Sequence, residues 1–429
     1  MRPLRGGLRW LYPGMRVKRW AGLTILSTAV ALYALFDLMG RATDCGLRSV
    51  LGIEGPARYL ALAALFVLAV VGQSLGLAHL VRSVARGVAP GRAQKPAELI
   101  YHTRVLERAP RVVALGGGTG LSTLLRGIKE LTGNIVAVVT VTDDGGSSGR
   151  LRRELGMLPP GDVRNCLIAL AADEPRIEQL FQHRLRGPEA LAGHSLGNLL
   201  LAGFSQAVGG FDRAIEELSH VLNVRGLVVP ATLAKIDLVA RMEDGEEIRG
   251  ETHIAADPRR ITNVTLSEPD VQPHGRVLDA LAAADVILLG PGSLYTSLVP
   301  NLLVTGIAAA IESSSAEKLL IANIMTQPGE TDGYALSDHL RVLQKYVNLH
   351  RFDAVIVNSE RPPAALLAAY REEAATPVRD DLDDSRPYGL TVVRSELLGV
   401  RPIEGKPTAK HDPRRLARTI ARSTRAFAR

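Results

Sequence analysis

Two long apolar segments lie near the start of the chain. Residues Ala21 to Met39 contain one charged side chain, Asp37, and residues Tyr59 to Val81 contain no Asp, Glu, Lys or Arg. Because a helix rises about 1.5 Å per residue, about 20 residues cross a hydrocarbon layer about 30 Å thick. The pattern predicts a two-helix transmembrane hairpin, with a buried globular hairpin as the alternative. A cleaved signal peptide is disfavoured because the second segment follows so closely.

Beyond Arg111, short apolar runs alternate with amphipathic patterns of helical period. This alternation is typical of an α/β fold, here a Rossmann-like, mostly parallel sheet with helices on both faces. An inserted β-hairpin is also expected, over Leu233–Arg241 and Glu246–Thr252. The predicted strands are Val112–Leu115, Ile135–Val141, Val286–Leu289, Leu319–Asn323 and Ala354–Val357. The predicted helices are Leu121–Leu131, Asp162–Ala171, Leu196–Ala207, Phe211–Leu222 and Leu336–Tyr346.

The segments between these patterns set the expected domain bounds. The polar connector is partly helical over Glu98–Arg108, and the acidic segment Arg371–Arg386 is expected to be a surface loop. The chain is thus divided into a basic cytoplasmic N-terminus (1–20), the hairpin (21–81), a linker (82–110), a nucleotide-binding domain (111–409) and a basic C-terminal tail (410–429).

The net charge of +7 is concentrated at the two ends of the chain. Residues 1–20 carry six Lys or Arg and no acid, and residues 410–429 carry seven against Asp412, which leaves −5 for all other residues. A nucleic-acid-binding domain would have basic residues on its folded surface, so no nucleic-acid partner is expected, although RNA binding by the tail stays open. Basic ends beside a hydrophobic hairpin fit an anionic membrane surface. By the positive-inside rule both termini and the main domain lie in the cytoplasm.

The two cysteines, Cys45 and Cys166, are too few and too far apart for a disulfide framework or a zinc site. We interpret Cys166 as a small buried hydrophobic residue.

Two glycine-rich turns follow the first two predicted strands. The first, Gly116–Gly120, precedes a helix whose free N–H groups suit a phosphate, and its glycines let a ligand approach the backbone. It matches neither a Walker A loop nor a dinucleotide fingerprint, so a tight turn without a ligand is an alternative. The second turn contains Asp143 and Asp144, which could accept ribose hydroxyls or hold Mg²⁺, followed by Gly145–Gly149. Its alternative is a flexible surface loop.

Two later helix starts also carry polar side chains. In L-P-P-G-D-V-R-N-C-L, Asp162 is a candidate N-cap with Arg164 and Asn165 in the first turn. In G-H-S-L-G-N, Ser195 is a candidate N-cap, and His194 is either a base or ligand contact or a hydrogen-bonded structural histidine.

Two further strands end in polar turns, one before Tyr295 and Thr296 and the other at Asn323. Because the carboxyl ends of parallel strands meet at one edge of a sheet, the four turns predict a binding cleft there. No Cys, His, Asp and Glu cluster has metal-site spacing, and no nucleophile elbow occurs. The expected ligand-binding residues are Gly117, Gly118, Thr119, Gly120, Asp143, Asp144, Ser147, Ser148, Asp162, Arg164, Asn165, Asn198, Gly292, Ser293, Tyr295, Thr296 and Asn323, with charge added by Arg150 and Arg152.

The chain resembles the YvcK-like gluconeogenesis factors, relatives of the CofD-like 2-phospho-L-lactate transferases, over about residues 111–358. The resemblance rests on G-G-G-T-G-L-S, D-D-G-G-S-S-G-R-L, P-P-G-D-V-R-N-C-L, G-H-S-L-G-N-L-L and G-P-G-S-L-Y-T-S. It implies a Rossmann-like fold that binds a UDP-sugar, such as UDP-N-acetylglucosamine, and a role in cell shape and envelope control during growth on non-glycolytic carbon. It also implies that Tyr295 grips the nucleotide-sugar.

The chain departs from this resemblance in its hairpin, because the usual members of the family are soluble. In the transferase relatives a carboxylate-bound metal assists phospho-group transfer, and Asp143 and Asp144 occupy the comparable place. The surrounding D-D-G-G-S-S-G is of the YvcK type, which favours binding over transfer.

The leading hypothesis is a membrane-tethered, UDP-sugar-binding regulatory protein of cell-envelope morphogenesis and carbon metabolism. Its expected partners are cell-wall synthesis or signalling proteins and further copies of itself in a homo-oligomer. The alternative is a magnesium-dependent phospho-group transferase that uses Asp143, Asp144 and His194. A membrane scaffold has the least support, because unused glycine loops would have no evident structural need.

The topology can be tested by cysteine labelling. A membrane-impermeant thiol reagent applied to intact cells is expected to label Cys45, in the short outer loop, and to leave Cys166 unlabelled. The full-length chain should also stay in membranes through high-salt and carbonate washes. Release by either wash alone would exclude the hairpin.

Overall fold

The structure is a computed structural model that describes residues 17–38, 56–88, 105–188, 191–382, 386–403 and 406–428. The chain divides into two compact units, Met1–Thr103 and Arg104–Arg429. The predictions for residues 1–16, for the loop 41–55 and for most of the linker lie outside the described residues.

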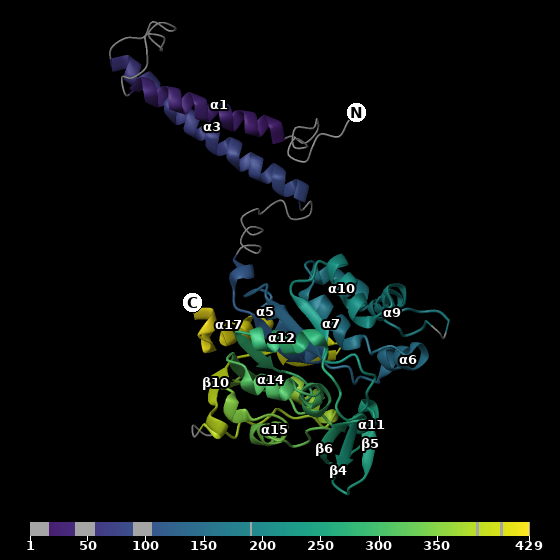
Figure 1. Cartoon of the computed structure of the whole chain (residues 1–429). Helices are drawn as coiled ribbons and strands as arrows, with labels where there is room; N and C mark the ends of the chain where they lie inside the picture. The colour runs from purple at the N-terminus through teal and green to yellow at the C-terminus, as the bar shows by residue number, and fades with distance from the viewer. Residues whose placement is uncertain are drawn as a thin grey trace. The chain divides into compact units, whose positions relative to one another are not determined.

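The first unit is a pair of helices, α1 (Val17–Leu38) and α3 (Pro56–Val88), shown in Figure 1. Within them, Arg19–Asp37 and Tyr59–Ser83 are long and apolar enough to cross a membrane. Large apolar side chains face outward, with Leu60 74% exposed and Ile25 71% exposed. Because a water-soluble fold would bury such side chains, their exposure is what a lipid-facing surface requires.

Small residues bring the two helices close together. A Cβ atom on Gly72 would lie 2.7 Å from Ser27 Oγ, and one on Gly76 would lie 2.6 Å from Thr24 Oγ1. The pair Gly72 and Gly76 has the spacing that lets membrane helices approach closely. The side chains of Trp20 and His79 stack, with ring centroids 4.1 Å apart.

The second unit is built on a seven-stranded sheet in the order β10-β9-β8-β7-β1-β2-β3, in which every paired neighbour is parallel. Its strands are β1 (Val112–Gly116), β2 (Ile135–Val139), β3 (Leu227–Pro230), β7 (Val286–Leu289), β8 (Glu317–Ile321), β9 (Ala354–Asn358) and β10 (Thr391–Ser395). The chain runs outward from β1 to β3 and returns to place β7 on the other side of β1. The strand order therefore reverses between β1 and β7, where open α/β sheets bind their ligands.

Two small antiparallel sheets accompany the main one. Strands β4 (Leu238–Met242), β5 (Glu247–Arg249) and β6 (Ile261–Leu266) form the first, which projects from one end of the domain in Figure 1. Strands β11 (Leu398–Ile403) and β12 (Lys406–His411) form the second. The expected hairpin is thus present, but its first strand starts at Leu238, β6 joins it, and Glu251–Ala256 is helical.

Helices cover both faces of the main sheet. The α-helices are α5 (Gly118–Ile128), α6 (Gly146–Leu155), α7 (Gly161–Leu170), α8 (Glu174–Phe181), α9 (Leu196–Val208), α10 (Phe211–Val221), α11 (Glu251–Ala256), α12 (Gly275–Ala283), α13 (Val299–Leu303), α14 (Ile307–Ser313), α15 (Leu336–Leu343), α16 (Ala364–Glu372) and α17 (Pro413–Ser423). Shorter turns are η2 (Leu106–Arg108), the π-helical η3 (Leu294–Leu298), η4 (Leu349–Arg351), η5 (Pro387–Gly389) and η6 (Ala426–Ala428).

The alternation of side chains along the strands separates two hydrophobic cores. On β1, Val112 and Ala114 face the core that contains α5, α7, α10 and α17. Val113 and Leu115 face the other core, which contains α12, α13, α14 and α15. The fold class expected from the sequence is therefore confirmed, as are the five predicted strands and five predicted helices to within a few residues.

The basic C-terminal segment differs from the separate tail expected from its charge. Residues 410–412 complete β12 and cap the next helix, and α17 packs on α5. Leu416 and Ile420 are fully buried, and a Cβ atom on Gly127 of α5 would overlap the Pro413 carbonyl. Periodic apolar residues between the arginines explain the difference, because they give α17 an apolar face that charge counting overlooks.

Replacement of Leu416 by Ala tests the contribution of α17. Loss of a fully buried leucine should lower the free energy of unfolding by about 2–4 kcal/mol, measured by urea denaturation of residues 104–429. Arg414→Ala, at an exposed position of the same helix, is the control and should change the stability by less than about 0.5 kcal/mol. Equal stabilities of the two variants would show that α17 is not part of the folded unit.

Candidate functional site

The turn after β1 brings helix α5 against the turn after β7. A Cβ atom on Gly120 would overlap the backbone of Pro291, and one on Gly117 would lie 2.6 Å from Asp162 Oδ2. These two glycines are therefore required for packing. Gly118, at φ +59°, has open space beside its Cα, so this part of the turn can approach a ligand.

A cavity of about 380 Å³ lies at the carboxyl ends of β1, β7 and β8, where the strand order reverses. Seven of the predicted ligand-binding residues line it: Gly117, Gly118, Thr119, Gly120, Gly292, Ser293 and Asn323. The Asn323 side chain joins the turn after β8 to the turn after β7. It accepts the Gly292 N–H at 3.2 Å and donates to the Gly292 carbonyl at 2.8 Å. The predicted cleft is thus present for these turns.

The C-terminal part of the domain supplies six further residues of the cavity: Tyr370, Glu373, Ala375, Ala409, Lys410 and His411. Lys410 Nζ donates to Thr119 Oγ1 at 2.8 Å, which places a cation against the glycine turn. The Tyr370 hydroxyl accepts the Ala409 N–H at 3.0 Å. Burial lowers the pKa of Lys410, and burial together with the Lys410 charge lowers the pKa of His411 to about 4. His411 is therefore neutral at pH 7.

Sequence reasoning missed Lys410 and His411 because the basic segment was interpreted as a tail, whereas Tyr370 lies in α16 and belongs to no motif. A signal was present in the run K-P-T-A-K-H, which alternates like a strand and is followed by an Asp-Pro helix start.

The two acidic residues after β2 have different roles. Asp144 caps α11, where it accepts the N–H of Thr252 at 2.9 Å and its hydroxyl at 2.6 Å. Asp143 accepts the Gly145 N–H at 2.9 Å. Burial and the neighbouring carboxylates raise the pKa of Asp143 and of Glu251, and burial and Asp143 raise that of Asp162 to about 7.

Asp143 and Asp144 thus bind different neighbours, and their pairing at a metal stays a prediction. Within the described ranges, no group of three or more His, Cys, Asp or Glu side chains is arranged to hold a metal ion. The carboxylates instead form a half-buried acidic cluster, defined as Asp143, Asp162 and Glu251, beside the glycine turn.

The motif G-H-S-L-G-N forms a buried polar network with the second glycine turn. His194 Nδ1 lies 2.8 Å from Ser147 Oγ, which also accepts from Asn198 at 3.0 Å. Arg164 donates to Ser195 and to Asn198, and burial lowers the pKa of His194. Among the residues that the structure describes along the cavity, none belongs to this network. His194 is thus best interpreted as the structural histidine among the alternatives.

The other arginines expected near a phosphate are also occupied elsewhere. Arg150 donates to the Ala192 carbonyl at 2.7 Å, and Arg152 pairs with Asp237. Asn165 accepts from Arg164 at 3.0 Å. Lys410 therefore supplies the positive charge that sequence reasoning had assigned to these arginines.

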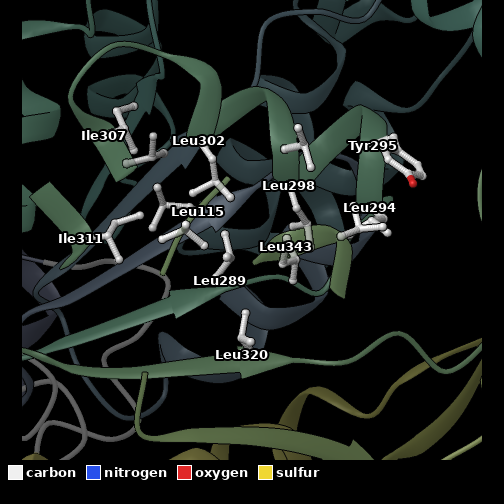
Figure 2. Close-up of a cluster of buried hydrophobic side chains, with 14 of the residues drawn as sticks. Leu115, Leu289, Leu294, Tyr295, Leu298, Leu302, Ile307, Ile311, Leu320 and Leu343 are labelled. Carbon is white, nitrogen blue, oxygen red and sulfur yellow. The ribbon is translucent and has the colours of Figure 1, made fainter. Parts of the chain in front are cut away.

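Tyr295 does not lie in the cavity, contrary to expectation. Its ring is 1% exposed and belongs to the hydrophobic core, as Figure 2 shows. Its hydroxyl lies 3.1 Å from that of Tyr334. A ring enclosed in this way offers no face to a ligand, and Thr296 likewise donates inward, to Glu330 at 2.9 Å. Burial raises the pKa of Glu330 to about 7.

Comparison with known proteins places this geometry in a family. The family model of 2-phospho-L-lactate transferase CofD matches residues 112–398. The gluconeogenesis factor of Halalkalibacterium halodurans is 47% identical over 309 residues, which cover 72% of this chain and 95% of that protein. The gluconeogenesis factor of Bacillus subtilis is 45% identical over 308 residues, covering 72% of this chain and 96% of that protein. The chain belongs to the gluconeogenesis-factor branch of the CofD family.

Other comparisons separate the two units of this gluconeogenesis-factor chain. A crystal structure of protein BH3568 from Bacillus halodurans is similar with a TM-score of 0.69 and 46% identity, covering 73% of this chain and 99% of that chain. The corresponding domain therefore folds without an N-terminal hairpin. A relative from Nostoc sp. is 40% identical over 428 residues, which cover 96% of this chain and 91% of that protein. The hairpin region is thus shared with at least one relative and is not unique to this chain.

The titration of Asp162 should be visible in the stability of the domain. Its folded pKa of about 7 exceeds the unfolded value of about 4, so the folded state binds the proton more tightly. The free energy of unfolding should therefore fall as the pH rises from about 4 to about 7.

Asp162→Asn removes this dependence while keeping an acceptor for the Gly118 N–H. In urea denaturation of residues 104–429 with a chelator present, the variant should gain about 2–4 kcal/mol at pH 8 and little at pH 4. Asp173→Asn, at an exposed position, is the control and should match the unaltered domain. A gain that is the same at both pH values would contradict the assignment.

Proposed function

We propose that this chain is a nucleotide-sugar-binding regulatory protein held at the cytoplasmic membrane, with a UDP-sugar such as UDP-N-acetylglucosamine as its ligand. The observation that carries the proposal is the polar cavity at the point where the strand order reverses. Its residues supply a cation and backbone N–H groups for a diphosphate, hydroxyl and amide groups for a ribose, and an aromatic face for a base or sugar ring. The name of the gluconeogenesis factors supports a role in carbon metabolism, and control of the cell envelope is part of the proposal.

The diphosphate would lie against the glycine turn. The first turn of α5 has backbone N–H groups and the positive end of the helix dipole, which favour an anion. Lys410 adds a formal charge that reaches Thr119 in the same turn. Because the acidic cluster lies on the other side of Gly117, the cation also reduces its repulsion of a phosphate.

The base or sugar ring would lie on Tyr370. Among the described residues that line the cavity, Tyr370 is the aromatic one, and its hydroxyl is fixed by the Ala409 N–H. Ser293 and Asn323 supply hydroxyl and amide groups that can bind the hydroxyls of a ribose or sugar. The stacking role that the sequence assigned to Tyr295 is therefore transferred to Tyr370.

A magnesium-dependent phospho-group transferase is the second candidate, and the CofD family model favours it at the level of family alone. The raised pKa of Asp162 shows that this buried carboxyl lacks sufficient positive charge around it. The described residues nevertheless do not form a metal site, so we derive no step through a metal. The arrangement favours binding over transfer.

Titration calorimetry of residues 104–429 with UDP-sugars tests the proposal. We expect binding of UDP-N-acetylglucosamine, weakened by about 1–3 kcal/mol in Tyr370→Ala through loss of stacking and by a similar amount in Lys410→Met through loss of a charged hydrogen bond. Tyr370→Phe should retain most of the affinity if the ring is what matters.

The controls are Tyr295→Phe and Lys345→Met, which alter a buried tyrosine outside the cavity and an exposed lysine. Both should leave the affinity unchanged. No heat with any UDP-sugar at millimolar concentration would sink the proposal. Phospho-group transfer in the same samples, dependent on added Mg²⁺, would establish the transferase instead.

A further inference from the structure

Helix α17 has one apolar and one strongly basic face. Leu416, Ala417 and Ile420 are buried against the domain. The opposite side carries the exposed Arg414, Arg418 and Arg422, and the exposed Arg425 follows after the helix ends at Ser423. We call these four arginines the arginine face. The first three follow one another at intervals of four residues and so lie along a single line of the helix.

The arginine face has little acidic compensation. Arg415, the other exposed arginine of α17, is paired with Glu360 at 3.0 Å and is not part of the face. In the part of the chain that the structure describes, none of the four arginines forms an ion pair with an acidic side chain. Glu317 lies at the end of the face, where its carboxylate accepts the backbone N–H groups of Arg425 and Ala426. The guanidinium groups are thus available to an external anion.

The arginine face ends beside the amino-terminal ends of the strands, where the described chain enters the sheet. Glu317 is the first residue of β8, and the entering chain, at Pro110, precedes β1. Strands β8 and β1 are two neighbours apart in the sheet, a separation of about 10 Å. Figure 1 shows the C-terminal end of α17 and the start of the domain on the same side of the sheet. Pro110 and the backbone of Arg425 therefore both lie at the amino-terminal ends of the strands of this sheet.

We propose that the arginine face docks on the anionic lipid headgroups of the membrane that holds the hairpin. This inference rests on the proposed membrane location, and it adds a second, reversible contact made by the folded domain itself. Each arginine near an anionic surface contributes about 1 kcal/mol to binding, so four arginines give a moderate affinity. The tether raises the effective concentration of the domain at the membrane, so that a moderate affinity is sufficient. Bidentate guanidinium groups also match the geometry of lipid phosphates.

A lipid surface fits the observations better than a nucleic acid. Outside its two basic ends the chain carries −5, which opposes the extended contact that a nucleic acid makes. A single line of arginines beside a hairpin long and apolar enough to cross a membrane instead matches a flat anionic surface.

Sedimentation of residues 104–429 with lipid vesicles tests the docking without the hairpin. The domain should bind vesicles of phosphatidylcholine with 30% phosphatidylglycerol (about one lipid in three) at low salt, and should dissociate at high salt. Binding to vesicles of phosphatidylcholine alone should be absent. The double variant Arg418→Glu/Arg422→Glu should reduce the partition coefficient by about 10–30-fold.

The matched control is Arg176→Glu/Arg213→Glu, which makes the same change in net charge at exposed positions of α8 and α10. It should retain most of the binding, and both double variants should keep the thermal midpoint of the unaltered domain. Equal loss in the two variants, or no binding to phosphatidylglycerol vesicles, would overturn the proposal. Tighter binding to single-stranded RNA, lost in the Arg418→Glu/Arg422→Glu variant, would also overturn it in favour of a nucleic-acid surface.

These outcomes are separate from those of the proposed function. UDP-sugar binding is measured by calorimetry on a cavity that the arginine face does not line. The hairpin is tested by carbonate extraction of the full-length chain. A domain that binds the sugar and fails to bind vesicles would refute the docking alone.

Discussion

The contact between the turn after β1 and the turn after β7 is the constraint on which the site depends. At Gly120 the helix backbone approaches the backbone of Pro291 so closely that no side chain can be inserted. This approach places the start of α5 at the point where the strand order reverses. Backbone N–H groups of α5, the turn after β7 and Asn323 then converge on one cavity. Close packing at Gly117 and Gly120 thus fixes the turn, while Gly118 keeps open space beside the cavity.

The second constraint is electrostatic. Burial raises the pKa of Asp162, in the acidic cluster, to about 7, and it does the same for Glu330, which accepts the Tyr295 N–H and the Thr296 hydroxyl. Each such carboxylate costs the fold free energy at neutral pH, because it is removed from water without a full counter-charge. Shifted pKa values of this kind gather at functional sites, and structural ion-pair networks produce them as well. The acidic cluster lies beside the glycine turn, and Lys410 donates to Thr119 of the same turn.

Much of the fold could be predicted from the sequence because the strands next to β1 are continuous apolar runs, for which burial on both faces leaves no other solution. Strand β3 was missed because its apolar run, Leu227–Pro230, is only four residues long and ends in proline, and β10 was missed because Thr391–Ser395 mixes polar and apolar residues. The glycine turns were found because runs of glycine after a strand indicate a tight turn directly from the sequence. Tyr295 was misplaced because a motif does not reveal which way a side chain points, and a π-helical turn directs this ring into the core. Tyr370 and Lys410 follow no glycine motif and reach the cavity only through long-range folding.

The contact between Lys410 and Thr119 joins residues that are 291 positions apart. During synthesis the glycine turn, the turn after β7 and Asn323 all leave the ribosome before β12, while domains generally fold as units. A chain that ended at β9 would therefore lack the cation that lies against the glycine turn. Premature termination after β9 would leave a chain without Tyr370 and Lys410, two of the residues that line the cavity. The full lining of the cavity thus requires the last strand, β12.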